Sequence, residues 1–181
     1  MTGATLRRTL HVTSAACLLL IPATSWAFFR TAAVATAVLV VGLEIVRLRS
    51  SWVGGWLGGL VPVFRPAESR RPSGAMWLAV GYAIASMFPP PAPVAGILVG
   101  ALADPAAAWI GEASGKTNAK TWRGSMGHLL VAAAVLLVAG FSWTSSIIAA
   151  ALGTTLERWP GPLNDNLIVP PVVAASVSLL A

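Results

Sequence analysis

Long apolar stretches separated by short polar segments run through the whole chain. We predict a helix in each of seven of them, because about 20 apolar residues in helical form span the core of a bilayer. The predicted ranges are 11–29, 31–48, 75–88, 94–113, 124–141, 143–159 and 167–181. The pattern therefore predicts an all-α, polytopic membrane protein that forms a single integral membrane domain over residues 1–181.

The segment 50–74 follows a different pattern. Trp52, Trp56 and Leu60 are interleaved with paired glycines, and an arginine-rich stretch follows them. We interpret this segment as a helix that lies in the cytoplasmic interface and packs tightly through its glycines. The alternative is a gate through which a lipid substrate enters.

Composition agrees with lipid as the solvent. Hydrophobic residues make up 56% of the 181 residues and charged residues only 10%, whereas soluble domains carry about 25% charged residues. The mean hydropathy is +0.78. A single cysteine, Cys17, excludes an internal disulfide and zinc sites built on paired cysteines. We attribute the net charge of +6 to loops that face an anionic membrane surface, not to a nucleic-acid partner.

Basic residues are distributed unevenly between the loops. Of the 12 Lys and Arg residues, only Arg30 falls on the second side of the predicted membrane. The positive-inside rule then places the amino terminus and the loops that carry the other 11 basic residues in the cytoplasm, with the chain in the cytoplasmic membrane. A secretory signal peptide over the first predicted span is an alternative interpretation.

The acidic residues Glu44 and Asp104 lie within predicted spans. A carboxylate there costs about 2.5–3.5 kcal/mol on insertion scales, so each needs a partner or a function. Glu44 lies one helical turn before Arg47, a spacing that permits an ion pair. Asp104 has no basic residue within four positions, which favours a metal ion or a distant partner. Because Pro105 follows, we expect this span to break into two half-helices.

The segment Gly111–Thr117 is close in spacing to a Walker A motif but is one residue too short between its glycines, so we reject a P-loop. Its glycines can still let backbone amides approach a phosphate, and Lys116 and Lys120 supply positive charge. We expect the next helix to begin at Gly124–Ser125 and to offer its amino terminus to an anion. A loop that only anchors the chain to the membrane is the alternative.

A third polar cluster lies between the last two predicted spans. It contains Glu157 and the run Asn164–Asn166. Helix capping would explain any one residue of that run. It would not explain Pro170 and Pro171 one turn later, which free backbone carbonyls that protein, water or an ion must satisfy. His11 and His128 fit either a hydrogen-bonded histidine near a span end or a catalytic group.

Together these residues resemble the CTP-dependent lipid alcohol kinases, a family that includes dolichol kinase, phytol kinase and the CTP-type diacylglycerol kinase. Phosphatidate cytidylyltransferase is a more distant relative of that family. The similarity covers nearly the whole chain, and it is carried by Arg7, Arg8, His11, Glu44, Arg47, Arg71, Ser73, Gly74, Asp104, Ala107, Gly111, Gly115, Lys116, Lys120, Thr121, Gly124, Ser125, Glu157, Asp165, Asn166 and Pro170. Two positions depart from the family pattern: Asn164 replaces an aspartate and Ala103 a common glycine.

The resemblance implies transfer of the γ-phosphate of CTP to the hydroxyl of a membrane lipid alcohol, such as a polyprenol, a phytol-like isoprenoid or diacylglycerol. It implies Mg²⁺ or another divalent cation as cofactor. The implied catalytic and metal-binding residues are Asp104, Glu157 and Asp165, one of them acting as base. The implied nucleotide-binding residues are Arg7, Arg8, Gly111, Gly115, Lys116, Lys120, Ser125 and Asn166, and the supporting residues are His11, Glu44, Arg47 and Arg71. A cytidylyltransferase that makes a CDP-lipid and a non-enzymatic transporter or scaffold are the alternatives.

Overall fold

The computed structural model describes residues 2–60, 64–65, 68–113 and 120–180 of the chain. Within these ranges the chain is all-helical and has no strand, so the all-α prediction is confirmed there. The α-helices are α1 (Gly3–Ser14), α2 (Leu20–Ala23), α3 (Trp26–Arg49), α4 (Ser51–Leu60), α5 (Gly74–Ala85), α6 (Ala92–Leu98), α7 (Asp104–Glu112), α8 (Trp122–Val138), α9 (Trp143–Arg158) and α10 (Asp165–Leu179). A 3₁₀ segment, η1 (Ala15–Leu19), joins α1 to α2.

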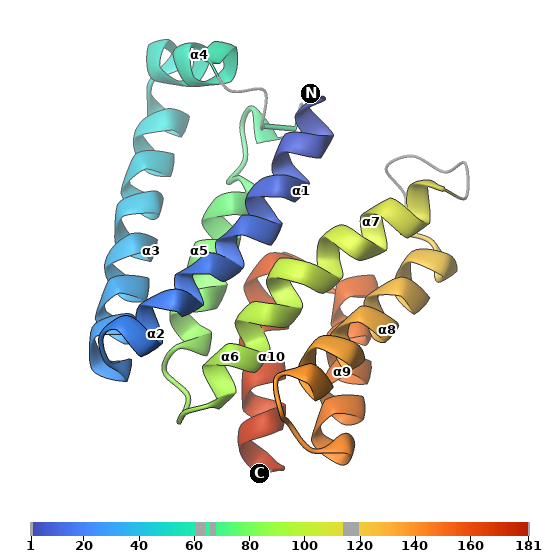
Figure 1. Cartoon of the computed structure of the whole chain (residues 1–181). Coiled ribbons are helices and arrows are strands. Elements are labelled where there is room, and N and C mark those ends of the chain that lie inside the picture. Colours follow the sequence, from blue (N-terminus) through green and yellow to red (C-terminus); the bar gives the residue numbers. More distant parts are fainter. Residues whose placement is uncertain (1, 61–63, 66–67, 114–119, 181) are drawn as a thin grey trace.

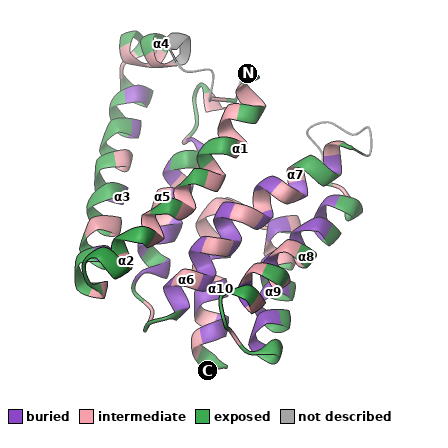
Figure 2. Cartoon of the chain, in the orientation of Figure 1, coloured by how far each residue is buried: buried purple, intermediate pink, exposed green. Residues whose placement is uncertain are grey.

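Helix α10 lies at the centre of the fold. It packs against α5, α6 and α9, and α8 packs against α7 and α9 (Figure 1). Most buried residues belong to these helices, as Figure 2 shows by colour. Helix α3 packs against α5 at the edge of the fold, and α4 lies across the end of α3. The interfacial location predicted for segment 50–74 stays a prediction.

Two helices are long and apolar enough to cross a membrane. They are α3, with 24 residues, and the helix Ala92–Glu112, with 21 residues. Only 17% of the apolar window of α3 is buried, so side chains such as Val38 and Leu39 form an exposed apolar surface. Helices occur in all seven predicted ranges, but the other apolar helices are shorter. Seven membrane spans therefore remain a prediction.

The boundary between the first two predicted spans lies earlier in the chain than expected. The first helical stretch ends at Ala23, and α3 begins at Trp26, five residues before the predicted start of the second span. The reason is local, because the Ser25 side chain accepts a hydrogen bond from the backbone N–H of Phe28 at 3.1 Å and caps α3.

The expected break at Asp104–Pro105 is wrong. The helix continues from Ala92 to Glu112, with a π-helical turn, η3 (Val99–Ala103), directly before Asp104. Pro105 has no N–H to donate into the preceding turn, and the wider π turn accommodates it without ending the helix. The N-cap residue of α7 is Ala103 and not Asp104, so capping does not explain the position of Asp104.

Prolines and glycines let α10 contact its neighbours closely. Pro170 and Pro171 supply no N–H to the carbonyls of Asn166 and Leu167. Both carbonyls lie against Gly81 of α5, where an added Cβ would stand 3.1 Å from the oxygen of Leu167 and even closer to that of Asn166. Such contacts allow Cα–H···O interactions. The protein backbone itself thus contacts the two freed carbonyls.

Candidate functional site

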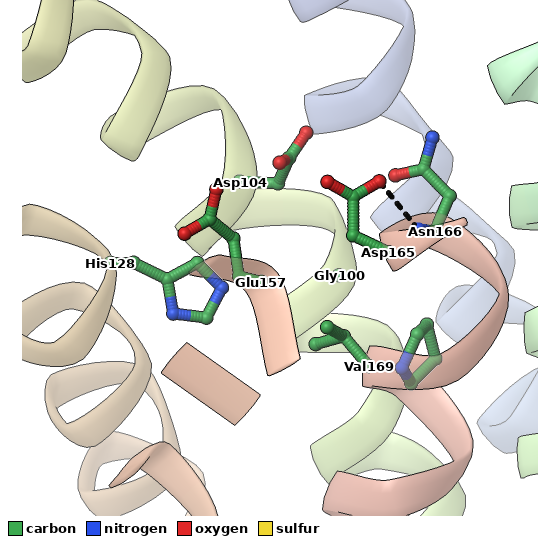
Figure 3. Close-up of a pocket in the computed structure, with 8 residues that line it drawn as sticks. Gly100, Asp104, His128, Glu157, Asp165, Asn166 and Val169 are labelled. Carbon is green, nitrogen blue, oxygen red and sulfur yellow. Dashed lines mark hydrogen bonds between the residues drawn. The ribbon is translucent and has the colours of Figure 1, made fainter. Parts of the chain in front are cut away.

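Three carboxylates converge where three helices meet. Asp104 is the first residue of α7, Glu157 is in the last turn of α9, and Asp165 is the first residue of α10. One carboxylate oxygen from each lies within 4.8 Å of the other two, and Figure 3 shows the three side chains facing a shared space. The sequence-based prediction named these residues as one site, and the fold brings them together across 61 positions of sequence.

The ammonium of Lys120 contacts two of these three carboxylates. Its Nζ lies 2.7 Å from Asp165 Oδ2 and 3.1 Å from Glu157 Oε1. Burial of the ammonium lowers the pKa of Lys120, but the charges and hydrogen bonds of Asp165 and Glu157 outweigh that effect and raise it above its usual value. The lysine therefore stays charged at neutral pH and offsets part of the carboxylate charge.

Helix α1 closes one side of the site through polar contacts. Arg8 pairs with Glu112 of α7, and Nδ1 of His11 lies 3.5 Å from Asp104 Oδ2. Ser14, one turn further on, shares a 2.9 Å hydrogen bond with the hydroxyl of Tyr82. These three residues of α1 are spaced three apart and so share one face of the helix. Because α1 has no buried residue, this polar face holds it against the rest of the fold.

A cavity of about 640 Å³ opens above the carboxylates. Its walls carry both signs of charge, with Arg7, Arg8, His11, Arg65, Lys120, Glu68, Asp104, Glu112, Glu157, Asp165 and Asn166 among the lining residues. Burial, together with the nearby charge of Arg65, lowers the pKa of Arg7. Arg7 and Arg65 thus crowd positive charge in one part of the wall, while Arg8 pairs with Glu112 and Lys120 pairs with Glu157 and Asp165. A wall of both signs is suited to a polyanion that carries a cation.

The carboxylate cluster fits a hard divalent cation. Its donor atoms are carboxylate oxygens, the ligand type that Mg²⁺, Ca²⁺ and Mn²⁺ prefer, and they come from three packed helices. Lys120 already balances part of the charge of Glu157 and Asp165, so a divalent ion would bind beside its ammonium. Asp104, Glu157 and Asp165 are the residues that would hold the ion.

The predicted anion site at the start of α8 is not available in the expected form. Helix α8 begins at Trp122, two residues earlier than predicted, and Thr121 caps it. The N–H of Gly124 donates to Thr121 Oγ1 at 3.0 Å, and the N–H of Ser125 donates to the Thr121 carbonyl at 2.9 Å. These two backbone N–H groups, which the sequence suggested for binding a phosphate, therefore already donate hydrogen bonds within the cap. The hydroxyl of Ser125 is buried and accepts a 3.2 Å hydrogen bond from Arg158.

Gly111 has a packing role as well as a place in the cavity wall. It lies inside α7, and its Cα faces Gly124 of α8, where an added Cβ on Gly124 would stand 3.5 Å from it. The two glycines let α7 and α8 approach closely, which brings Lys120 and Thr121 next to the carboxylates. Gly115 and Lys116, the other predicted phosphate-binding residues of this segment, lie outside the described residues.

Glu44 and Arg47 form the ion pair that their spacing predicted. Arg47 donates to both Glu44 oxygens at 2.9 Å, and both side chains are buried. Arg47 also donates to the carbonyls of Glu68 and Arg71, while Glu44 accepts from the N–H of Ser73. The pair does not line the large cavity. It supports the site by holding the segment before α5, in which Arg71 contributes its carbonyl and its side chain is exposed.

Asn164 and Asn166 shape the start of α10. The side chain of Asn164 accepts a 3.0 Å hydrogen bond from the N–H of Asn166 and caps the helix. Asn166 Nδ2 donates to the carbonyl of Gly74 at 3.2 Å and so ties α10 to α5. The side chain of Asn164 therefore has a capping role beside the carboxylate cluster.

Three charged residues of the cavity wall were missed by sequence reasoning. Arg65 and Glu68 belong to the basic segment interpreted as interfacial, and Glu112 closes α7. Glu68 accepts hydrogen bonds from the N–H groups of Arg65 at 2.8 Å and Gly74 at 3.1 Å. An acidic residue inside an arginine-rich stretch was the available signal for Glu68. No local sequence pattern indicated that Glu68 would line the same cavity as residues of α1 and α7.

No family model matches the chain, and comparisons with curated proteins and with solved structures also find no match. The inference of function therefore rests on the geometry of the site and on the family resemblance of the sequence.

Proposed function

We propose that the protein is a membrane enzyme that transfers the γ-phosphoryl group of CTP to the hydroxyl of a lipid alcohol. The observation that carries this proposal is the convergence of Asp104, Glu157 and Asp165 beneath a cavity whose wall also bears Arg7 and Arg8. CTP as the donor and a polyprenol, a phytol-like isoprenoid or diacylglycerol as the acceptor follow from the family resemblance.

Phosphoryl transfer depends on positioning and charge neutralisation more than on covalent chemistry. A divalent ion at the carboxylates would supply neutralisation of the phosphate oxygens. Arg7 and Arg8 would bind the remaining phosphate charge, Arg8 while its guanidinium also pairs with Glu112. Lys120 holds Glu157 and Asp165 in place through its two ion pairs. The side chains thus provide binding and orientation around one reaction centre.

The transfer step balances within this site. The acceptor hydroxyl oxygen bonds to the γ-phosphorus, the bond from that phosphorus to the bridging oxygen breaks, and CDP leaves with the electron pair. The hydroxyl proton passes to one of the three carboxylates, which are the general bases nearest the reaction centre. The products are CDP and a lipid monophosphate.

The surroundings of the cavity suit an apolar acceptor. Leu10 of α1 lines the cavity and is still 48% exposed at the surface of the protein. A single helix, α1, therefore separates the cavity from the surrounding medium, and it has no buried residue. In a bilayer, an acceptor would reach the carboxylates laterally, past α1, while the soluble nucleotide enters from the arginine-rich side.

The test uses purified full-length protein, mixed lipid alcohols and CTP labelled in turn at the γ- and α-phosphorus. We expect label in the extracted lipid only from γ-labelled CTP, and none with the Glu157→Gln variant. Label from α-labelled CTP would instead show a cytidylyltransferase that forms a CDP-lipid. Absence of lipid label from both donors, with folded protein, would contradict the proposal and favour a non-enzymatic role.

A further inference from the structure

His128 of α8 is a completely buried side chain beside the carboxylate site, with 0% of its surface exposed. Its Nδ1 lies 2.9 Å from Thr154 Oγ1 on α9, whereas its Nε2 has no hydrogen-bond partner among the described residues. Leaving a buried polar atom unpaired costs about 1–3 kcal/mol. Such an atom in a native fold calls for an explanation, and a ligand is one.

The imidazole lines a second, smaller cavity of about 10 Å³. Asp104, Glu157 and Asp165 line the same cavity, and Val169 and Pro170 are on its buried side. Figure 3 shows the His128 ring next to Glu157 at this cavity. One water molecule needs about 10–15 Å³ of such space. The cavity therefore has room for one small polar ligand between Nε2 and the carboxylates.

We propose that His128 is a positioning residue of the carboxylate site, whose Nε2 binds a water molecule belonging to a cation held by Asp104, Glu157 and Asp165. This inference rests on the cation-binding part of the proposed function. It adds a nitrogen acceptor from α8 to a site whose ligands come from α7, α9 and α10. Outer groups of this kind orient the ligands of metal sites.

The hydroxyl of Thr154 can set the tautomer of the His128 imidazole through its contact with Nδ1. Its hydroxyl can accept a hydrogen bond from Nδ1–H, which leaves the lone pair of Nε2 directed at the cavity. In that tautomer Nε2 accepts a hydrogen bond from a water molecule. Thr154→Val removes the hydroxyl at nearly constant volume, whereas Thr154→Ser keeps it, so this pair of variants tests the orientation of the ring.

The decisive variants replace the His128 imidazole with a side-chain amide, which lies near the position of Nε2 in one variant and near that of Nδ1 in the other. His128→Gln puts polar atoms near the position of Nε2, and His128→Asn puts them near Nδ1. Binding of Mn²⁺, an ion that accepts carboxylate ligands, is measured on detergent-solubilised full-length protein by electron paramagnetic resonance of the free ion. We expect His128→Asn to weaken Mn²⁺ binding by about 10–100-fold, and His128→Gln to bind nearly as tightly as the wild type.

The outcomes separate this inference from the proposed function. If the wild type binds no Mn²⁺ with carboxylate-dependent affinity, the cation site fails, and this inference fails with it. In a second outcome, the wild type binds Mn²⁺ and His128→Asn binds the ion as tightly as His128→Gln does, or more tightly. That outcome overturns the role of His128 but leaves the cation site intact. Where a His128 variant does not fold, Thr154→Val decides, since unchanged Mn²⁺ affinity relative to Thr154→Ser also overturns the role.

Discussion

Nζ of Lys120 lies 2.7 Å from Oδ2 of Asp165, which ties the residue before the Thr121 cap of α8 to the first residue of α10. The same ammonium lies 3.1 Å from Glu157 Oε1. One lysine thus joins two of the three helices that supply carboxylates. Its ammonium lies at a position where the same carboxylates would also stabilise a divalent cation.

Replacing Lys120 with methionine is therefore expected to make the fold more dependent on divalent cations. Without the ammonium, three carboxylates repel one another, so the unfolding temperature should fall without cations and rise more than that of the wild type when Mg²⁺ is added. Thermal unfolding in detergent measures both values. Arg123→Met, at an exposed position of α8, is the matched control, and an equal response of both variants to Mg²⁺ would contradict the prediction.

Asp104→Asn should abolish most activity while the protein remains folded. Asparagine keeps the size of the side chain but removes the charge that offsets a cation, and we expect lipid phosphorylation to fall by about 100-fold or more. Initial rates with γ-labelled CTP, alongside thermal unfolding, provide the measurement. Near-normal rates in this variant would remove Asp104 from the catalytic site.

The buried Glu44–Arg47 pair should matter for stability more than for catalysis. Arg47→Met leaves the Glu44 carboxylate buried without its partner, a change that costs about 3–5 kcal/mol. The double variant Glu44→Leu/Arg47→Met removes both charges and should lose less stability than the single one. Unfolding in detergent tests this order. A double variant that is less stable than Arg47→Met would show that the pair itself stabilises the segment before α5.

Gly81→Ala should disturb the start of α10. The new Cβ would collide with the carbonyl of Asn166, and overpacking of this kind costs about 1–3 kcal/mol. Gly42→Ala of α3 is the control, because a Cβ there meets nothing within 4 Å and alanine favours the helix by about 1 kcal/mol. Thermal unfolding of the two variants should move in opposite directions, and an equal shift would disprove the close contact.

The proposed topology can be tested at the carboxyl terminus. Seven spans with a cytoplasmic amino terminus place Ala181 on the opposite side of the membrane. A reporter that works only in the cytoplasm should be silent when fused after this residue and active when fused after Arg49. A strong signal from both fusions would overturn the span count or the orientation.

Sequence patterns predicted the helical class, and together with the family resemblance they predicted the members of the candidate site. Apolar runs of bilayer length are typical of helices, because every backbone group must be hydrogen-bonded within the segment. Asp104 stood out, because carboxylates are rare in such runs, and Glu157 stood out as part of the polar cluster between the last two predicted spans. The i,i+3 spacing likewise predicted the Glu44–Arg47 ion pair, which depends only on local helical geometry.

Other features depended on contacts between segments distant in sequence. The π turn before Pro105 keeps one helix continuous, and no local pattern distinguishes it from a break. The pairing of Lys120 with Glu157 and Asp165, and the unpaired Nε2 of His128, arise only when α8, α9 and α10 pack together. The sequence by itself therefore determined which residues are chemically capable, because rarity and spacing are local properties. Only the tertiary structure decided which of them meet, because packing sets distances between helices.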